Sequence, residues 1–238
     1  MSVRNRPDGP VLGPRLASAI PFVRPGDRVA DIGTDHAYLP IRLVRDGISP
    51  QALATDIAQG PIDRAREHIR ASGLVDRIST LRTPGLEGVG PFGPDTVLIF
   101  GMGGDLIARI LDGADWLGTD GPRLVLQPMT HAEQVRIWLH GHGYVPCGEI
   151  LSEEDGKFYI TIGADPGVPD GAMTESGKWL GSLTRDNPPD LAGRYLDACL
   201  ATQEKIVNAL RKAGRDSTPE MKKLEILRAA KDSLGISY

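Results

Sequence analysis

VADIGTDHAYLP, the stretch from Val29 to Pro40, decides the fold of this chain. Its first four residues are small or β-branched apart from one aspartate, which is typical of a buried strand. Gly33 permits a tight turn after that strand, and we expect a helix from His36 to Val44. A strand that passes through a glycine turn into a helix is a unit of an open parallel sheet. Such sheets bind ligands beyond the carboxyl ends of their strands, so we expect the functional site at this turn.

The polar residues of the turn indicate the kind of ligand. Asp31 and Asp35 place two carboxylates at the end of the strand. A dinucleotide-binding turn would carry GxGxxG, which lets a pyrophosphate approach the backbone, but Gly33 is the single glycine here. A phosphate would be repelled by Asp35, whereas a ligand with a cationic centre and an α-amino group would be attracted. S-adenosylmethionine is such a ligand, and a nicotinamide-dependent oxidoreductase is the disfavoured alternative.

The order of the expected elements indicates the fold class. Strand-like runs alternate with helical ones and close with two β-rich runs that we interpret as an antiparallel hairpin. The expected strands are Val29–Ile32, Gln51–Ile57, Ile78–Arg82, Asp95–Phe100, Arg123–Leu126, Tyr144–Leu151 and Phe158–Gly163. This order predicts an α/β protein with the Rossmann-like, mostly parallel sheet of a class I methyltransferase and a C-terminal antiparallel hairpin. A nicotinamide dehydrogenase would have an all-parallel sheet.

Two further strand ends carry residues suited to a nucleoside ligand. Asp56 follows the glycine turn by about 20 residues, where a carboxylate can accept hydrogen bonds from both ribose hydroxyls. Glycines at Gly101, Gly103 and Gly104 end the central strand, so a ligand is expected to approach this backbone closely. The alternative is tight strand–helix packing. The helix that follows Pro61 has a basic side, interpreted as a solvated face, with Arg64, Arg66, His68 and Arg70.

The last part of the chain is expected to be helical. Apolar residues repeat at helical spacing from Leu191 to Leu210, and a capping box formed by Ser217 and Glu220 is expected to start a second helix. The connection is short, so the two helices should form an antiparallel hairpin. We expect a flexible segment at 1–13, a catalytic domain at 14–169 and this helical domain at 170–238.

Composition and charge limit the partners. The chain has 238 residues and a net charge of -4, which disfavours gross electrostatic binding to nucleic acid but allows a local basic patch. Cys147 and Cys199 form no metal-ligand spacing, so we expect a reducing compartment and no metal. The sequence has no apolar run long enough to cross a membrane, and we expect a cytoplasmic protein without membrane contact.

Five motifs, in order along nearly the whole chain, resemble those of the bacterial tRNA (adenine(22)-N(1))-methyltransferases of the TrmK type. They are DIGTDHAYLP at Asp31–Pro40, GP at Gly60–Pro61, GMGG at Gly101–Gly104, LQP at Leu126–Pro128 and EEDGKFY at Glu153–Tyr159. The resemblance implies a class I methyltransferase domain followed by a helical, coiled-coil-like extension. It also implies S-adenosylmethionine as cofactor, S-adenosylhomocysteine as product, and N1 of adenine 22 in tRNA as the methylated atom.

The resemblance assigns roles to individual residues. Asp35 is expected to be the catalytic carboxylate, accepting a hydrogen bond from the adenine N6 amino group; capping of the following helix is a compatible alternative. The residues expected to bind the cofactor are Asp31, Gly33, Thr34, His36, Asp56, Ile57, Gly101, Met102 and Gly103. Those expected to contact the substrate are Tyr38, Gln127 and Pro128, together with Lys205, Arg211 and Lys212, which belong to the basic cluster of the C-terminal helices. His36 is also a candidate for holding the target base. The alternative for the basic C-terminal helices is a dimerisation or stabilising role, which would give a weak homodimer.

Two positions depart from the family pattern. Pro84 stands where the family usually has a carboxylate that faces the cofactor adenine, and Met129 stands where it usually has asparagine. These departures leave a third alternative beside the methyltransferase and the oxidoreductase. It is a non-catalytic or divergent relative that binds S-adenosylmethionine or RNA.

Overall fold

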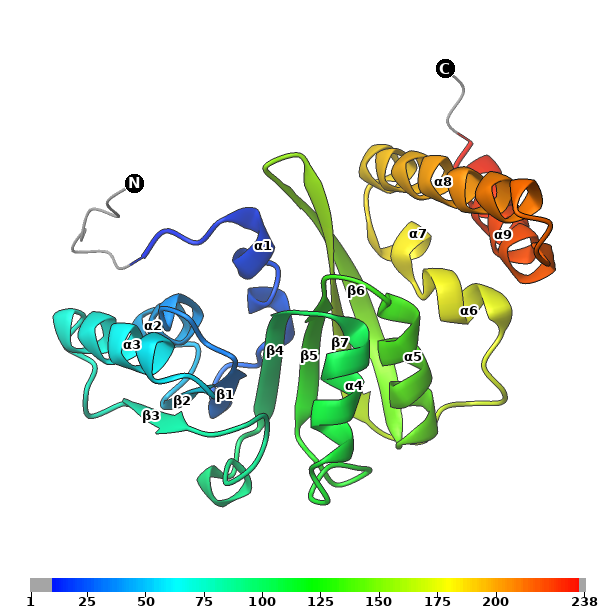
Figure 1. Ribbon diagram of the computed structural model, residues 1–238. Helices are drawn as coiled ribbons and strands as arrows, with labels where there is room; N and C mark the ends of the chain where they lie inside the picture. Colours follow the sequence, from blue (N-terminus) through cyan, green and yellow to red (C-terminus); the bar gives the residue numbers. More distant parts are fainter. Residues whose placement is uncertain (1–9, 236–238) are drawn as a thin grey trace.

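The computed structural model describes residues 10–235 and shows a central sheet with helices on both faces and a pair of long helices beyond one edge (Figure 1). The predicted flexible segment at 1–13 therefore falls mostly outside the described residues. The strands are β1 Val29–Ile32, β2 Ala52–Asp56, β3 Ile78–Arg82, β4 Thr96–Met102, β5 Arg123–Pro128, β6 Tyr144–Glu154 and β7 Lys157–Pro166.

The helices follow the expected alternation with the strands and continue beyond the sheet. They are α1 Pro14–Ala17, η1 Ile20–Phe22, α2 Tyr38–Arg45, α3 Gln59–Ala71, η2 Gly90–Phe92, α4 Gly104–Asp112, α5 Ala132–Gly141, α6 Glu175–Leu180, α7 Leu183–Asp186, α8 Pro189–Lys212 and α9 Thr218–Ser233. No helix within 10–235 is long and apolar enough to cross a bilayer.

The sheet has the strand order β3-β2-β1-β4-β5-β7-β6. β1 pairs in parallel with β2 on one side and with β4 on the other, so the strand order reverses at β1 and β4. β7 is antiparallel to both β5 and β6. The predicted class I methyltransferase sheet is confirmed, including its closing hairpin. The reversal at β1 and β4 marks the edge where a ligand is expected.

The core consists of two apolar layers separated by the sheet. Ala30 and Ile32 pack against α4 and α5, whereas Val29 packs against α2 and α3. All four side chains of β1 are buried, and successive side chains of a strand point to opposite faces. Asp31 therefore shares a face with Val29. Burying a carboxylate in this position costs stability, which makes Asp31 a candidate for contact with a ligand.

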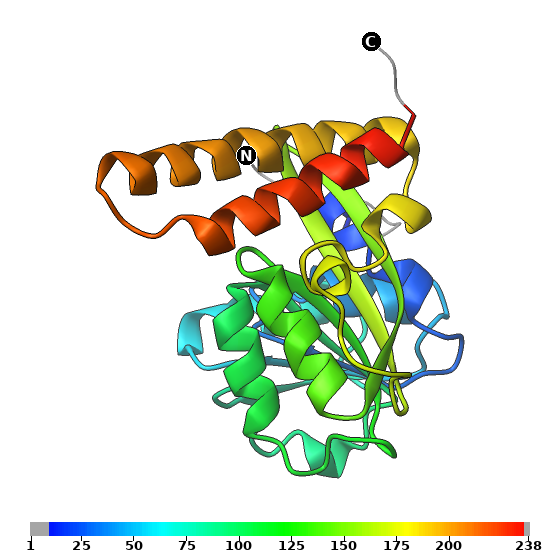
Figure 2. The same cartoon turned by 90° about the vertical axis from the view of Figure 1, so that its right-hand side faces the viewer.

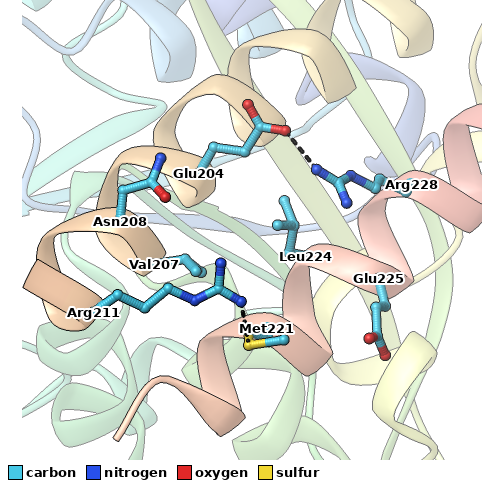
Figure 3. Close-up of a pocket in the computed structure, with 8 residues that line it drawn as sticks. All are labelled: Glu204, Val207, Asn208, Arg211, Met221, Leu224, Glu225 and Arg228. Carbon is cyan, nitrogen blue, oxygen red and sulfur yellow. Dashed lines mark hydrogen bonds and ion pairs between the residues drawn. The ribbon is translucent and has the colours of Figure 1, made fainter. Parts of the chain in front are cut away.

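Helices α8 and α9 form the predicted antiparallel hairpin, and they lie beyond the edge where β4 and β5 end (Figures 1 and 2). Leu196 of α8 and Leu227 of α9 meet Leu180 of α6 in a separate apolar cluster. The hairpin is splayed enough for side chains to line a cleft between its helices, where Arg228 pairs with Glu204 at 2.7 Å (Figure 3).

The capping box predicted for the second helix is wrong, although the helix begins close to the expected place. The Ser217 side chain accepts no hydrogen bond from the start of α9, and the Thr218 N–H donates instead to Asp216 Oδ1 at 2.9 Å. Glu220 is engaged by Gln203 of α8, whose Nε2 donates to both its carboxylate and its backbone oxygen. Tertiary packing between the helices thus replaces the local cap.

Two short helices that we did not predict, α6 and α7, attach the helical pair to the sheet. Arg136 of α5 donates from Nε and Nη2 to the two carboxylate oxygens of Glu149 on β6, each at 2.7 Å. Its Nη1 also donates to the carbonyl oxygens of Lys178 and Trp179 in α6. After α7, Asn187 accepts from the Leu151 N–H at 2.7 Å. The C-terminal helices are therefore fixed to the domain by buried polar contacts.

Candidate ligand and catalytic site

Two cavities at the carboxyl ends of β1 and β4 meet at Gly33. One has a volume of about 530 Å³ and extends toward β2 and β3; the other, of about 420 Å³, extends toward α1 and α2. Gly33 lines both and has φ +78, and a Cβ there would collide with the methyl group of Met102. The left-handed backbone conformation therefore favours glycine at this position, whereas the flexible Met102 side chain could move aside. One elongated ligand can pass over this position and occupy both cavities.

The larger cavity has a carboxylate at one end and an apolar wall opposite. Asp56 lines it at the end of β2, and its Oδ1 accepts a hydrogen bond from the Ala58 N–H at 2.7 Å. Ile57, Pro84 and Leu86 supply apolar surface. A ribose whose hydroxyls donate to Asp56 and a purine against the apolar wall match these features. Pro84 presents its ring to this wall of the cavity.

Asp31 supplies a buried carboxylate to the smaller cavity. The side chain is 7% exposed, and burial raises its pKa to about 6, with repulsion from Asp56 adding to the rise and a hydrogen bond with Thr34 opposing it. Thr34 itself is buried and also accepts from the Ala37 N–H at 3.1 Å, which fixes the turn. A ligand cation placed here would relieve the cost of ionising Asp31.

Asp35 stands at the mouth of the smaller cavity and is held from two sides. Arg64 of α3 donates to its Oδ1 from Nε and Nη2, and His36 Nε2 lies 3.1 Å from its Oδ2. It does not cap α2, because that helix begins at Tyr38 after Ala37 adopts a left-handed conformation with φ 55. The capping interpretation is therefore wrong.

Three rings form a cluster beside Asp35. His36 and Tyr38 are stacked with centroids 5.0 Å apart, and His68 of α3 lies 5.2 Å from the first and 5.0 Å from the second. His68 Nδ1 is 3.1 Å from the His36 carbonyl oxygen. The predicted solvated face is confirmed for Arg66 and Arg70, which are exposed, whereas the exposed Arg64 and the half-buried His68 also contact residues of the turn after β1. The sequence shows a helix with a basic side but not which neighbour that side meets.

Gln127 lies deeper than expected for a substrate-contacting residue. It is fully buried, and its Nε2 donates to the Arg15 carbonyl oxygen and to Thr161 Oγ1, each at 2.9 Å. Its Oε1 accepts from Arg15 Nη1 at 3.2 Å. The amide therefore positions Arg15, which lines the smaller cavity above Gly101. We did not identify Arg15 from the sequence, because only the fold brings α1 to the end of β4.

The glycines after β4 differ in their surroundings. Gly101 lines the smaller cavity. Gly103 is the N-cap of α4, and a Cβ there would lie 3.1 Å from Thr130 Oγ1, outside both cavities. Gly104 lies directly against the backbone of His131, where a Cβ would overlap the carbonyl group. Close backbone packing therefore explains why residue 104 is glycine. Gly101 instead lines the cavity, where a ligand can approach its backbone.

The remaining substrate candidates lie at the end of β5 and on α8. Pro128 ends β5 and, with the exposed side chain of Met129, lines a third cavity of about 430 Å³ beneath α8. Lys205 and Lys212 are exposed on α8. Arg211 is exposed as well, and its Nη2 contacts Met221 Sδ at 3.0 Å across the helical hairpin (Figure 3). None of these four residues lines either of the two cavities that meet at Gly33.

Metal ligands are not grouped in the part of the chain that the structure describes. Residues 10–235 contain no cluster of three or more histidine, cysteine, aspartate or glutamate side chains suited to a metal ion. His142, close to Cys147 in sequence, stacks on Trp138 with ring centroids 4.3 Å apart.

Comparisons with known proteins agree with this geometry. Residues 12–162 match the family model described as a methyltransferase domain. A Bacillus subtilis (strain 168) protein named tRNA (adenine(22)-N(1))-methyltransferase is 39% identical over 161 residues, which cover 68% of each chain.

Solved structures resemble almost the whole chain. A Streptococcus pneumoniae structure in complex with S-adenosyl-L-methionine has a TM-score of 0.80 and 30% identity, covering 93% of this chain and 100% of the other. The structure of M. capricolum TrmK in complex with the cofactor product S-adenosyl-homocysteine has a TM-score of 0.80 and 27% identity. That match covers 94% of this chain and 99% of the other. The resemblance drawn from the sequence motifs is confirmed.

Proposed function

Because the chain belongs to the family of tRNA (adenine(22)-N(1))-methyltransferases, we propose that it transfers a methyl group from S-adenosylmethionine to N1 of adenine 22 in tRNA. The observation that carries the proposal is the pair of cavities joined over Gly33, with Asp56 in one and Asp31 and Asp35 at the other. A nicotinamide-dependent oxidoreductase lacks support, because the turn offers no second glycine for a pyrophosphate and the sheet closes with an antiparallel hairpin.

The cavities fit the two ends of this cofactor. Asp56 would accept hydrogen bonds from the ribose hydroxyls, while Ile57 and Pro84 would contact the adenine ring. Asp31 would face the cationic end, where its buried carboxylate gains a partner. S-adenosylmethionine supplies an electrophilic methyl group bound to a sulfonium, so the protein needs to position the acceptor base and stabilise the charge that appears on it.

Asp35 is suited to that second task. Adenine N1 has a lone pair and needs no general base to attack, but alkylation places positive charge on the ring. A carboxylate that accepts a hydrogen bond from the N6 amino group offsets this charge as it develops, and it can then take a proton from N6. Arg64 engages Oδ1 of Asp35 with two donors and His36 contacts Oδ2, so the remaining acceptor capacity for N6 lies on Oδ2.

The ring cluster beside Asp35 would hold the target base. Adenine must leave the tRNA stack to reach a cavity, and stacking on aromatic side chains contributes about 1–3 kcal/mol per base. His36 and Tyr38 offer a nearly parallel pair of rings at the cavity mouth, with an interplanar angle of 15°. Arg64 fixes the carboxylate next to them, so base and carboxylate would meet in one defined orientation.

The basic side of α8 is our candidate for tRNA docking. Lys205, Arg211 and Lys212 are exposed on a helix that lies beyond the carboxyl edge of the sheet (Figure 2). Phosphate contacts by such side chains give affinity and register, whereas the chemistry stays in the domain below. A tRNA substrate would also place the reaction in the cytoplasm. The competing proposal is that the hairpin stabilises the fold or a weak homodimer and leaves its cations solvated.

The proposed function is tested by methyl transfer to unmodified tRNA followed by nucleoside mass spectrometry. The wild-type protein should produce 1-methyladenosine at position 22. Asp35→Asn should lower kcat by about 100-fold or more while S-adenosylhomocysteine affinity stays within about twofold, because the neutral amide can neither offset the positive charge that develops on the ring nor take a proton from N6. A wild-type protein that binds cofactor and tRNA but produces no modified nucleoside would support the non-catalytic alternative. Full turnover by Asp35→Asn would refute the role of Asp35.

A further inference from the structure

A third cavity lies between the end of β5 and the helical pair (Figure 2). Its volume is about 430 Å³, and none of its lining residues lines either of the two cavities that meet at Gly33. Pro128 and Met129 form one side, whereas Gln203 of α8 and Lys223 of α9 form another. The proposed cofactor site does not use this cavity, so its side chains call for a ligand of their own.

Aromatic and apolar side chains give the cavity surfaces on which a nucleobase can stack. Phe158 of β7 and Tyr195 of α8 meet edge to face, with ring centroids 5.8 Å apart and an interplanar angle of 78°. Trp179 of α6 lines the cavity as well. Met129 and Ile206, which are 46% and 41% exposed, extend the apolar surface toward solvent. Unstacked RNA bases are bound by aromatic surfaces of this kind.

A buried amide supplies the cavity with a polar contact. Gln203 lines the cavity and is 2% exposed. Its Nε2 donates to the Glu220 backbone oxygen at 3.0 Å and also to the Glu220 carboxylate, which fixes the orientation of the amide. Within residues 10–235, the Gln203 Oε1 accepts no hydrogen bond and so keeps its acceptor capacity. The exocyclic amino groups of adenine, guanine and cytosine are matching donors.

The charges around the cavity suit the phosphates of an RNA strand. Lys223 lines the cavity with its Nζ 4.0 Å from the centroid of the Trp179 ring, and Lys178 Nζ lies 4.6 Å from the same centroid. Neither lysine forms an ion pair with another described residue, whereas Glu133 is the carboxylate that lines the cavity. Cations beside an aromatic pocket match a nucleotide, whose base is flat and whose phosphate is anionic.

The sheet sets the distance between this cavity and the proposed base site at Asp35. The strand order places β5 two strands away from β1. Neighbouring strands are about 4.8 Å apart, so the ends of β1 and β5 are separated by roughly 10 Å. One strand of a stacked nucleic acid rises by about 3.4 Å per nucleotide, so this separation corresponds to about three nucleotides. A single RNA strand can therefore reach both sites.

We propose that the third cavity binds an unstacked nucleobase of the tRNA substrate, from a nucleotide within about three positions of the methylated adenine. Gln203 Oε1 accepts a hydrogen bond from the exocyclic amino group of that base. The proposal rests on the function proposed above and adds a second base site, distinct from the one at Asp35. Holding a flanking nucleotide would fix the strand while the target adenine leaves the stack.

The test measures tRNA binding to the full-length protein at saturating S-adenosylhomocysteine, so the result does not depend on turnover. Intact tRNA is compared with six tRNAs, each of which lacks the base of one of the three nucleotides on either side of adenine 22. One of these abasic tRNAs should bind the wild type about 10-fold or more weakly than intact tRNA, the range expected for loss of a base stacked on aromatic rings.

Ala198→Trp fills the cavity with an indole and leaves the charge unchanged, because Ala198 is an exposed residue of α8 that lines the cavity. It should bind intact tRNA about 10-fold more weakly and show no further loss with the abasic tRNA that identifies the site. Ala71→Trp is the matched control, because Ala71 is an exposed alanine of α3, which packs on β2 and β3 at the other end of the sheet. This variant should bind every tRNA as the wild type does.

The identity of the base tests the contact with Gln203. At the nucleotide that the abasic series identifies, cytosine should bind the wild type about 3- to 10-fold more tightly than uracil, which has the same size but no exocyclic amino group. Ala198→Trp should not distinguish the two bases. Equal binding of both bases to the wild type would overturn the role of Gln203. A preference that persists in Ala198→Trp would overturn it too, because it would then arise outside the cavity.

Equal affinity of the wild type for the intact tRNA and all six abasic tRNAs would overturn the proposal, while methylation of intact tRNA at adenine 22 would leave the proposed function standing. Full additivity of the losses from Ala198→Trp and from the abasic nucleotide would also overturn it, since the two changes would then act at separate places. If Ala198→Trp does not fold, Ile206→Ser, which removes an exposed apolar side chain from the cavity, decides by the same comparison. Wild-type protein that binds no tRNA would refute the proposed function and the second base site with it.

Discussion

Asp31 shows, at the scale of one residue, how a carboxylate suited to ligand binding can lower the stability of the ligand-free protein. Its pKa is raised from 3.8 to about 6, first because burial disfavours the charged form and then because Asp56 repels it. The folded protein therefore holds this proton more tightly than the unfolded chain does. Stability from this group is fully present below pH 3.8 and is lost as the pH rises through about 6. The loss at neutral pH is about 3 kcal/mol, at about 1.4 kcal/mol per pKa unit.

Asp31→Asn should remove this pH-dependent loss in the ligand-free protein. At pH 8 the variant should gain up to about 3 kcal/mol in free energy of unfolding over the wild type, and near pH 4.5 the gain should shrink to a fraction of that. Urea unfolding at a series of pH values gives the comparison. Thr34→Val is a useful companion variant, because it removes the hydrogen bond that opposes the rise in pKa and should increase the loss. Parallel pH profiles for wild type and Asp31→Asn would contradict this account.

Cofactor binding should show the opposite pH dependence. The cationic end of S-adenosylhomocysteine favours ionised Asp31, so wild-type affinity should rise with pH and level off above about 6. Below that value the affinity should fall by up to about tenfold per pH unit, as expected for one linked proton. Calorimetry between pH 5 and 8 measures the slope. Asp31→Asn should bind more weakly at pH 8 and show a flat profile, and a variant with the wild-type slope would exclude Asp31 as its source.

The residue scale also shows what a sequence can and cannot reveal about a site. Asp31, Gly33 and Asp56 could be identified because each follows a strand, and parallel strands end at one edge of the sheet. Arg15 and Arg64 could not, because they reach the cavities from α1 and α3, whose contacts depend on helix packing. Gln127 was found by its motif, but its burial and its role in holding Arg15 are properties of the folded chain.

At the scale of elements, the strands and long helices were predictable and the short connecting helices were not. The central strand β4 has a continuous apolar run, the other parallel strands follow turn signals, and α8 and α9 repeat apolar residues over many turns. Helices α6 and α7 have six and four residues, too few to show a period. Their stability comes from tertiary contacts such as those of Arg136 with the carbonyl groups of α6.

The ion pair between Arg136 and Glu149 makes the attachment of these elements testable. Both side chains are buried, so Arg136→Met leaves Glu149 without a partner and should lower the free energy of unfolding by about 3–5 kcal/mol. The double variant Arg136→Met/Glu149→Leu should be destabilised less than Arg136→Met alone, because no buried charge remains. Chemical denaturation of the wild type, both single variants and the double variant completes the double-mutant cycle. Additive losses would show that the two side chains act independently.

Arg24→Met, which breaks an exposed pair with Asp165, is the control and should lower the free energy of unfolding by no more than about 1 kcal/mol.

At the scale of the whole molecule, the fold separates the two cavities from the basic side of α8. The cavities lie at the carboxyl edge of the sheet, and α8 and α9 lie beyond that edge (Figure 1). Buried hydrogen bonds around Arg136 and Asn187 fix these helices to the domain. The net charge of -4 means that the protein as a whole does not attract RNA, so a local cationic surface would have to do so. Cofactor binding and tRNA binding should therefore respond to different substitutions.

Lys205→Glu/Lys212→Glu tests this separation in the full-length protein. The two lysines are seven residues apart on α8 and share one exposed face, so reversing both should raise the KM for tRNA by about tenfold or more at low salt. The same change should flatten the dependence of KM on salt and leave S-adenosylhomocysteine affinity unchanged. Arg66→Glu/Arg70→Glu on α3 is the matched control, because it alters the net charge equally on another helix and should have a much smaller effect. Equal effects of both pairs would point to net charge alone. A lost dimer in light scattering, with tRNA affinity intact, would assign the helical pair to dimerisation instead of docking.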